Sequence, residues 1–206
     1  MKVIYFWDAY CGWCFGFGKV LAEFLDKHPE LEVDVVSGGL FVGARVQPMS
    51  NMPYIAGANA RIGEMFGVQF GTAYNQLVEQ GTYQMNSYHP AAVLMEMKKF
   101  LKNRPLFDFA KAMQTAFYQK GADLTKVESY LPLLEHFNLQ DKISKEALSQ
   151  CLASQTAISD FALTQQFGVQ SYPTLVLKYD DKYYDLRQNA MGVAELDKNL
   201  TSILSM

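Results

Sequence analysis

The first forty residues carry a hydrophobic pattern that predicts a strand, a helix and a second strand. Residues 3–7 are an unbroken run of β-branched and aromatic side chains, which is typical of a strand buried on both faces. Apolar side chains then recur at helical spacing from residue 14 to 27, and this pattern ends before His28 and Pro29. Residues 31–36 alternate between apolar and acidic side chains, which indicates a second strand. Together they predict a βαβ unit whose two strands are parallel.

The pattern between residues 43 and 150 predicts helices only. This stretch is rich in Ala, Met, Gln and Leu, and single prolines and glycines interrupt it. Between these interruptions we expect helices near residues 54–66, 70–80, 90–102, 106–119, 125–136 and 144–150. The sequence therefore predicts an all-helical region in the middle of the chain.

From residue 154 onward the pattern again mixes helices and strands. It predicts a helix over 154–167, a strand over 174–178, a turn at Asp180 and Asp181, a hairpin partner over 183–186, and a final helix over 193–204. We therefore predict an α/β fold in which residues 1–42 and 151–206 form one discontinuous domain around a small mixed sheet. Residues 43–150 form an all-helical insertion in that domain.

The composition predicts an ordinary protein surface around a large core. The chain has 206 residues, of which 50% are hydrophobic and 19% are charged, and its formal net charge is −3. Because no long run of like charge occurs, the sequence gives no electrostatic reason to expect binding to nucleic acid or to a membrane surface. No run reaches the roughly 18 apolar residues of a membrane span. The sequence predicts no particular oligomeric state.

The N-terminal apolar run predicts a strand rather than a signal peptide. Asp8 interrupts the run, which continues directly into the first two cysteines. A signal peptide has a separate hydrophobic region and a cleavage site, and neither is present. We therefore expect a cytoplasmic protein, and an exported mature form stays open as the alternative.

The candidate chemistry lies in Cys11-Gly12-Trp13-Cys14, directly after the first predicted strand. A thiolate attacks disulfides, and the free N–H groups and the positive dipole end at a helix N-terminus favour that anion. Cys14 lies one helical turn further on and can close a disulfide with Cys11. This spacing predicts a redox-active dithiol in which Cys11 attacks and Cys14 resolves the mixed disulfide. The third cysteine, Cys151, is expected to pack in the core.

Two simpler hypotheses remain for the cysteine pair: ordinary core cysteines, or half of a zinc site. A structural zinc site needs four ligands, and only Cys151 and three scattered histidines are left to supply the rest. The position of the pair, after a buried strand and at the start of a helix, favours the redox hypothesis.

A second feature lies about 160 residues further along the chain. Pro173 stands directly before the apolar strand predicted over 174–178. A proline at the first position of a strand removes one donor from the ladder, and it tolerates a cis peptide bond better than any other residue. The alternative is an ordinary trans proline at the start of an edge strand.

These two motifs resemble the active site of the thioredoxin superfamily. The run from Tyr5 to Cys14 is similar to its dithiol site, and Tyr172-Pro173-Thr174 is similar to its cis-proline loop. The helical insertion makes the chain resemble the DsbA-like proteins, in particular cytoplasmic predicted disulfide isomerases with a Cys-Gly-Trp-Cys centre. The resemblance implies that Cys11 is the exposed nucleophile, Cys14 its buried partner, and Pro173 a cis residue beside them. It also implies that the Tyr172 backbone pairs with a substrate strand.

The chain departs from the better-known members of this family in two places. Thioredoxin and DsbA carry a buried acid six residues before the first cysteine, where this chain has Tyr5, and the nearest acid is Asp8. The Gly12-Trp13 dipeptide also lacks the histidine that helps to make DsbA and protein disulfide isomerase oxidising. The sequence therefore leaves open both the proton acceptor for Cys14 and the redox direction.

We predict a thiol–disulfide oxidoreductase or isomerase that acts on protein or peptide disulfides. No metal or organic cofactor is expected, and glutathione or a partner reductase is the expected redox partner. Trp13, Tyr10 and Tyr172 are the predicted substrate-binding residues, and the first two belong to a predicted apolar rim made of Trp7, Tyr10, Trp13, Phe15 and Phe17. Gly38 and Gly39 are expected to form a tight strand exit, with a close backbone approach to substrate as the alternative.

Two other functions stay open. Kappa-class glutathione transferases and hydroxychromene carboxylate isomerases share the DsbA-like architecture and activate glutathione with a serine-type centre. The presence of both Cys11 and Cys14 argues against this chemistry. The other alternative is a non-catalytic chaperone module that binds peptides on the apolar rim.

Overall fold

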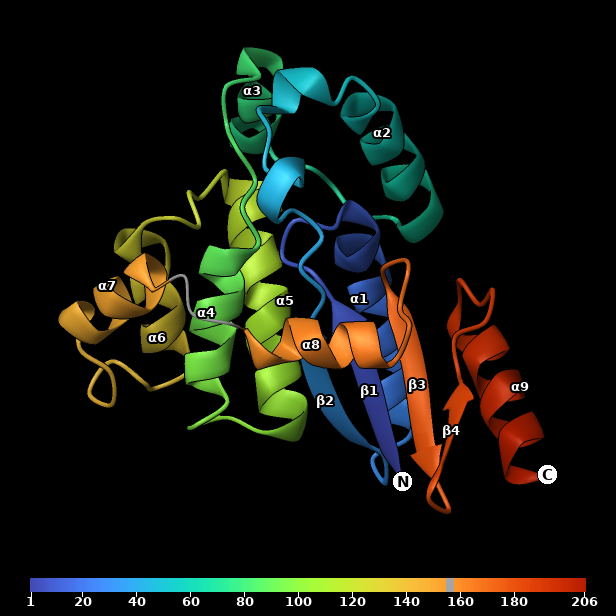
Figure 1. Cartoon of the computed structure of the whole chain (residues 1–206). Coiled ribbons are helices and arrows are strands. Elements are labelled where there is room, and N and C mark those ends of the chain that lie inside the picture. Colours follow the sequence, from blue (N-terminus) through green and yellow to red (C-terminus); the bar gives the residue numbers. More distant parts are fainter. Residues whose placement is uncertain (155–157) are drawn as a thin grey trace.

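The computed structural model describes residues 1–154 and 158–206. The described residues form a four-stranded sheet in the order β2-β1-β3-β4 (Figure 1). Strand β1 (Lys2–Trp7) pairs in parallel with β2 (Glu32–Ser37) and antiparallel with β3 (Thr174–Tyr179), which in turn pairs antiparallel with β4 (Lys182–Asp185). Both the predicted βαβ unit and the predicted hairpin are confirmed.

Strand β1 is buried on both faces, which explains its unbroken apolar sequence. Tyr5 and Trp7 face the main core, which contains residues of α1 (Gly12–Lys27) and α5 (Asn103–Lys120). Ile4 and Phe6 face a smaller core under α8 (Ser159–Gln166), where Phe6 packs against the ring of Phe167. Helices α1 and α8 lie on opposite faces of the sheet (Figure 1). Each face therefore buries every second side chain of β1.

The middle of the chain is helical, as the sequence predicts. It contains α2 (Ile55–Phe66), α3 (Thr72–Gln80), α4 (Tyr88–Met97), α5, α6 (Leu131–His136) and α7 (Lys145–Ala153), with short 3-10 turns at Gly43–Arg45, Met49–Asn51 and Val127–Ser129. Helices α2 and α3 lie over the carboxyl end of β1, where α1 begins (Figure 1). The insertion thus covers the end of the sheet at which the cysteines lie.

Several predicted boundaries were wrong. The helix expected over 90–102 ends at Met97, and α5 begins at Asn103, because Pro105 fits the first turn of a helix. The helix expected over 125–136 is helical only from Leu131, after the 3-10 turn. Helix α8 begins at Ser159, and the part of its prediction that falls on residues 155–157 lies outside the described residues. The proposed domain boundary between residues 150 and 151 lies within α7.

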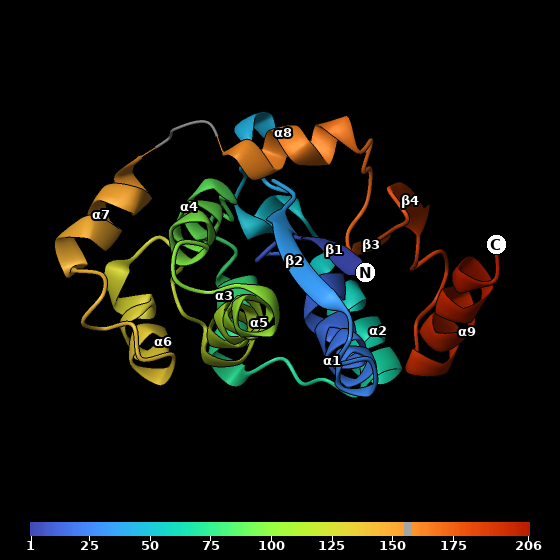
Figure 2. The ribbon, with the colours of Figure 1, turned by 90° about the horizontal axis from the view of Figure 1, so that it is seen from below.

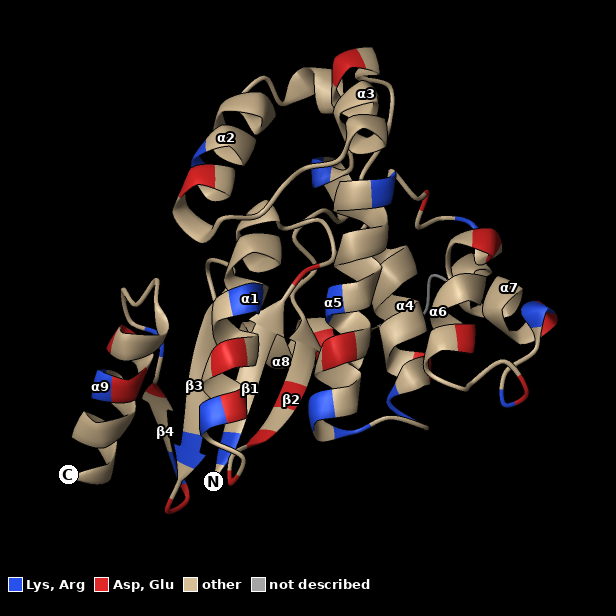
Figure 3. Ribbon diagram, turned by 180° about the vertical axis from the view of Figure 1, so that it is seen from behind, with Lys and Arg blue, Asp and Glu red and all other residues tan. Residues whose placement is uncertain are grey.

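The last helix, α9 (Val193–Leu204), packs against α1. Seen from below, α6 and α7 lie at one end of the molecule and α9 at the other, with α1 and β1 between them (Figure 2). Acidic and basic residues are interspersed along α1, α5 and α9 (Figure 3). Within the described ranges no helix is long and apolar enough to cross a membrane.

Candidate active site

The cysteine pair lies where β1 passes into α1. Cys11 is the N-cap residue of α1, and its sulfur accepts the backbone N–H of Cys14 at 3.3 Å. The Cys11 N–H donates to the carbonyl oxygen of Asp8 at 3.1 Å, which closes the turn between strand and helix. Both cysteines are free thiols. The predicted position at a helix N-terminus is confirmed.

Cys11 is more buried than the resemblance implies. It is 4% exposed and Cys14 is fully buried, whereas the resemblance implies an exposed Cys11. Helix α2 also packs closely on the first turns of α1. A Cβ on Gly12 would lie 3.1 Å from Ile62, and one on Gly16 would lie 2.4 Å from the Phe66 ring. Because only glycine fits at Gly16, α2 can cover this end of α1.

The environment of Cys14 keeps it protonated. Burial raises the pKa of the Cys14 thiol well above its usual value. The hydrogen bond to Cys11 and the negative charge of Cys11 raise the pKa of Cys14 further. Tyr5, at the position where the resemblance expects an acid, donates its hydroxyl to the Cys14 carbonyl oxygen at 3.4 Å. Burial also raises the pKa of Tyr5 well above its usual value, so this neighbour is uncharged at neutral pH.

Asp8, the nearest acid, anchors the site rather than facing solvent. One carboxylate oxygen accepts the Tyr10 N–H and the Ser87 hydroxyl, both at 3.0 Å, and the other accepts the Leu40 N–H at 2.8 Å. The side chain is 2% exposed, and burial raises the pKa of its carboxyl although these hydrogen bonds oppose the shift. Asp8 therefore joins the end of β1 to the loop after β2 and to the residue before α4.

Gln114 is a site residue that the sequence did not reveal. Its amide donates to the carbonyl oxygens of Asp8 and Cys11, at 3.0 and 3.2 Å, and its side chain is 1% exposed. These bonds fix both ends of the loop that carries the nucleophile. A single buried glutamine within a helical pattern gives no sequence signal, because its role depends on α5 packing beside this loop.

The loop before β3 meets the cysteine pair from the other side. The Tyr172–Pro173 peptide bond is cis, as the resemblance implies. The Cys11 thiol donates to the carbonyl oxygen of Tyr172 at 3.6 Å, within the longer limit for sulfur donors. Strand pairing begins at Thr174, so the Tyr172 backbone lies beyond the end of the ladder. Sulfur and carbonyl therefore come from opposite ends of the chain.

The two glycines after β2 have different roles. Gly39 has a φ of +68°, which suits the predicted strand exit. At Gly38 a Cβ would lie 2.1 Å from the ring of Tyr172, whose hydroxyl donates to the Gly38 carbonyl oxygen at 2.6 Å. The group that approaches the Gly38 backbone closely is thus the Tyr172 side chain of this protein.

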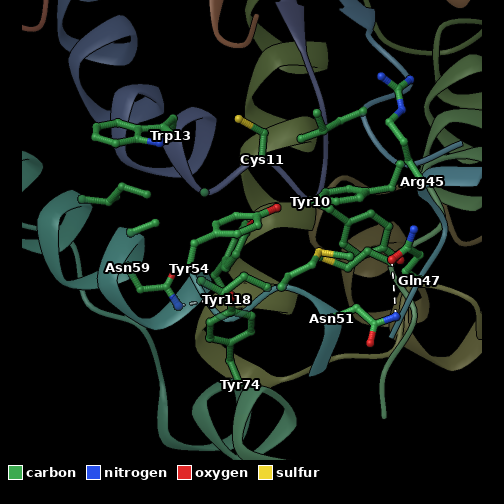
Figure 4. Close-up of a pocket in the computed structure, with 18 residues that line it drawn as sticks. Tyr10, Cys11, Trp13, Arg45, Gln47, Asn51, Tyr54, Asn59, Tyr74 and Tyr118 are labelled. Atoms are coloured by element: carbon green, nitrogen blue, oxygen red, sulfur yellow. Dashed lines mark hydrogen bonds between the residues drawn. The ribbon is translucent and has the colours of Figure 1, made fainter. Parts of the chain in front are cut away.

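A cavity of about 450 Å³ opens beside Cys11 (Figure 4). Its walls come from the first turn of α1, the loop between β2 and α2, helix α2, and single residues of α3 and α5. Cys11, Trp13 and Arg45 lie along one side, and Asn59, Tyr74 and Asn51 lie along the opposite side. The cavity thus borders the otherwise buried Cys11.

The predicted apolar rim is only partly correct. Tyr10 and Trp13 line the cavity, and half-buried Trp13 packs edge-on against Phe66. Trp7 and Phe17 are core residues with at most 1% exposure, because they face the sheet and the centre of the helix packing. Phe15 packs between Phe70 and Tyr118 outside the cavity lining.

The remaining cysteine lies apart from the pair. Cys151 is on α7, half-buried, with its sulfur 3.9 Å from a carboxylate oxygen of Glu96. Among residues 1–154 and 158–206, no three His, Cys, Asp or Glu side chains gather in a group that could hold a metal ion. That the protein needs no metal or organic cofactor stays a prediction.

No protein-family model and no curated protein matches the sequence, but solved structures do. The cytosolic disulfide reductase DsbM from Pseudomonas aeruginosa superposes with a TM-score of 0.80 at 22% identity, over 100% of this chain and 99% of that one. The chain has the DsbA-like thioredoxin fold. A structure of DsbM with glutathione gives a TM-score of 0.79 at 21% identity over the full length of both chains. A 2-hydroxychromene-2-carboxylate isomerase gives 0.60 at 14% identity, over 98% of this chain and 94% of that one.

Proposed function

We propose that this protein is a thiol–disulfide oxidoreductase whose nucleophile is Cys11. The observation that carries the proposal is the position of the Cys11 sulfur, which accepts the N–H of Cys14 and lies against the Tyr172 carbonyl at the edge of a cavity. The N–H donor and the N-terminus of α1 support a thiolate at this sulfur. The fold that the chain shares with DsbM is compatible with this chemistry.

The first step is attack by the Cys11 thiolate on one sulfur of a substrate disulfide. A bond forms between Cys11 and that sulfur, the substrate S–S bond breaks, and the other substrate sulfur leaves as a thiolate. The Cys11 sulfur is then neutral, so the Cys14 N–H no longer faces a negative charge. Buried Cys14 stays a thiol during this step, because its pKa is raised by burial.

The second step is attack by Cys14 on the Cys11 sulfur of the mixed disulfide. Cys14 first passes its proton to the thiolate released in the first step, the Cys11–Cys14 bond then forms, and the second substrate sulfur leaves as a thiolate. The substrate disulfide has gained two electrons and the protein dithiol has lost them. Two glutathione molecules can return these electrons by the reverse exchanges, releasing glutathione disulfide. The same steps run backwards would oxidise a substrate dithiol.

A peptide-like substrate would use the Tyr172 backbone. Its carbonyl accepts the Cys11 thiol in the resting dithiol, and this backbone lies beyond the last ladder pair of β3. An extended substrate segment can add its own N–H to that carbonyl, as in strand addition at a sheet edge. The incoming N–H would then replace the thiol as donor and release the Cys11 sulfur for attack. Pro173 follows as a residue without an N–H, and Trp13 and Tyr10 offer apolar contacts in the cavity.

Glutathione is the redox partner we propose. The cavity volume falls within the usual range for small-molecule sites, and a tripeptide fits within it. The structural neighbour DsbM has been solved with glutathione. A cytoplasmic location, where glutathione keeps thiols reduced, belongs to the same proposal.

The proposal is tested by trapping the mixed disulfide. In a Cys151→Ser background, Cys14→Ser should accumulate one glutathione on Cys11 when treated with glutathione disulfide, as seen by intact mass and peptide mapping. Cys11→Ser in the same background is the matched control and should stay unmodified at Cys14, because that thiol is buried and protonated. Modification of Cys14 in the control, or none of Cys11, contradicts the proposal.

The same variants separate the two other functions. A transferase or isomerase of the serine-centre type would turn over a small electrophile with glutathione even after Cys14→Ser. A non-catalytic chaperone would suppress client aggregation equally well when both Cys11 and Cys14 are serine. For the oxidoreductase we expect neither of these activities: Cys14→Ser should stop at the mixed disulfide on Cys11, and the double serine variant should not exchange at all.

A further inference from the structure

The cavity beside Cys11 has a positive charge on its wall. Among the described residues that line it, Arg45 is the only charged side chain, and the other polar groups are amides and hydroxyls. Arg45 is exposed and belongs to the 3-10 turn Gly43–Arg45. The cavity therefore offers a cation but no acidic partner to a ligand.

The Arg45 guanidinium is held in place without being neutralised. One of its nitrogens donates to the Gly39 carbonyl oxygen at 2.8 Å. No ion pair joins Arg45 to a carboxylate within the described ranges, whereas Arg104 pairs with both Asp26 and Asp108. A guanidinium has five N–H donors in a planar fork that fits a carboxylate, so most of its donor capacity stays available.

Arg45 and the Cys11 sulfur are linked through Tyr172 and the two glycines after β2. Tyr172 accepts the Cys11 thiol at its carbonyl oxygen and donates its hydroxyl to Gly38, next to the glycine that holds Arg45. Burial raises the pKa of Tyr172 to about 12, with Asp8, Cys14 and Cys11 adding to the rise and the charge of Arg45 opposing it. Cys11 and Arg45 both lie on one side of the cavity (Figure 4).

We propose that Arg45 binds the glycine-end carboxylate of glutathione while its sulfur reacts at Cys11. This inference rests on the proposed function and assigns a recognition residue to it. Glutathione has two carboxylates and one ammonium. The γ-glutamyl carboxylate is paired within the molecule by the neighbouring ammonium, so the glycine carboxylate carries the uncompensated charge.

The chemistry of the ligand is compatible with this assignment. The glycine carboxylate lies one residue beyond the reacting cysteine of glutathione, and one residue spans about 3.5 Å of extended chain. A sulfur at Cys11 therefore keeps that carboxylate on the Cys11 side of the cavity, where Arg45 lies. Amide groups of Gln47, Asn51 and Asn59 on the wall can meet the peptide groups of the ligand.

The test compares glutathione with its glycine monoethyl ester, which removes only that carboxylate charge. For the wild type, KM for reduction of the Cys11–Cys14 disulfide should be roughly tenfold lower with glutathione than with the ester, because a charge-assisted contact at an exposed site is of moderate strength. Arg45→Gln should raise KM for glutathione to the ester value and abolish the preference. Arg45→Lys should keep part of it. The wild-type preference should also shrink as ionic strength rises.

Arg61→Gln is the matched control. Arg61 lies over the Trp13 ring at 6.0 Å but does not line the cavity, so this variant should keep the full preference. The inference is overturned if the wild type uses the ester as well as glutathione, or if Arg45→Gln still discriminates between them. Reduction of the wild-type disulfide by dithiothreitol, which has no carboxylate, reports separately on the proposed function. If dithiothreitol reduces the disulfide but no carboxylate preference exists, only the role of Arg45 fails.

Discussion

The sulfur of Cys11 lies 3.6 Å from the carbonyl oxygen of Tyr172, a residue 161 positions further along the chain. Neither residue could hold this position alone. Cys11 is fixed by the turn to Asp8 and by Gln114, and Tyr172 is fixed by its hydroxyl bond to Gly38. The site therefore depends on three segments meeting at the carboxyl end of β1.

Gly38→Ala should displace the loop that carries Tyr172. The new Cβ would lie 2.1 Å from the tyrosine ring, so the ring must move. We expect a loss of about 2 kcal/mol in the free energy of unfolding. The exchange rate should fall roughly 10- to 100-fold, because the Tyr172 carbonyl no longer lies against Cys11. Urea unfolding and a glutathione-exchange assay measure the two effects.

The matched control for that variant is Gly57→Ala on α2. A Cβ at Gly57 meets no atom within 4 Å, and alanine is the better helix former. This variant should be neutral or more stable by about 0.5–1 kcal/mol, with unchanged exchange. If Gly38→Ala behaves like Gly57→Ala, the close contact with Tyr172 does not control the site.

Gln114→Leu should loosen the nucleophile loop. The variant removes one donor from each of the buried carbonyl oxygens of Asp8 and Cys11, which keep their backbone donors, so it should cost about 1–3 kcal/mol of stability. Gln119→Leu changes an exposed residue of the same helix and should alter stability by no more than about 0.5 kcal/mol. Chemical unfolding of both variants gives the comparison, and equal effects would argue against the role assigned to Gln114.

Tyr5→Phe should slow the resolving step and leave the first attack unchanged. The Tyr5 hydroxyl donates to the carbonyl oxygen of Cys14 and not to the Cys11 sulfur. Its loss therefore removes a hydrogen bond at Cys14 and leaves the contacts of Cys11 in place. We expect release of the second substrate thiol to slow about fivefold, the effect of one hydrogen bond.

Stopped-flow measurement of the two thiol-release phases separates these steps. Tyr130→Phe is the control, because its hydroxyl is equally buried but bonds the Leu124 carbonyl oxygen at 2.7 Å. It should leave both phases unchanged. Slowing of the first phase in Tyr5→Phe, or equal slowing in both variants, would show that Tyr5 does not act on Cys14.

Asp8 should make the protein less stable as pH rises. Burial raises the pKa of Asp8, so the folded protein holds this proton more tightly than the unfolded chain does. The stability it contributes is complete below the unfolded-chain pKa of about 4 and is lost as the pH rises through the raised folded-state pKa. Asp8→Asn removes this titration. Other groups cancel when the variant is subtracted from the wild type.

Urea unfolding at a series of pH values measures that difference. The wild-type free energy of unfolding minus that of Asp8→Asn should fall across the window and then become flat. In the variant the Leu40 N–H loses the carboxylate oxygen that accepts its hydrogen bond. This loss changes the difference in the free energy of unfolding by a constant amount that does not depend on pH. A difference that rises with pH would mean that the three hydrogen bonds to the carboxylate outweigh its burial.

The sequence predicted the parts of the fold that depend on local pattern. The run at residues 3–7, the helix after it and the alternation at 31–36 define the βαβ unit, because each burial pattern repeats within one element. The spacing of Cys11 and Cys14 placed the pair at a helix start. The resemblance at Tyr172 and Pro173 linked it to a loop that no local pattern could connect.

The rest of the site depends on packing between distant elements. Helix α2 packs on Gly12 and Gly16 of α1, and a glycine within a helical sequence does not show which neighbouring element will cover it. Gln114 and Arg45 belong to no sequence motif. Gln114 reaches the site from α5, and Arg45 lines the cavity from a short 3-10 turn. Sequence proximity to the cysteines predicts that the aromatic residues Trp7 and Phe17 lie on the rim. Strand and helix geometry instead directs both side chains into the core.

The most direct test of the account is the redox equilibrium of the wild-type pair in a series of buffers with different ratios of glutathione to glutathione disulfide. Acid quenching, alkylation and mass analysis give the fraction of reduced protein at each ratio. We predict that Cys11 and Cys14 change together as one two-electron couple, with Cys151 unaffected. The ratio of reduced to oxidised protein should be proportional to the square of the glutathione concentration divided by the concentration of glutathione disulfide. Two thiols that stay reduced at every ratio, or that titrate independently of each other, would contradict a redox-active dithiol at the start of α1.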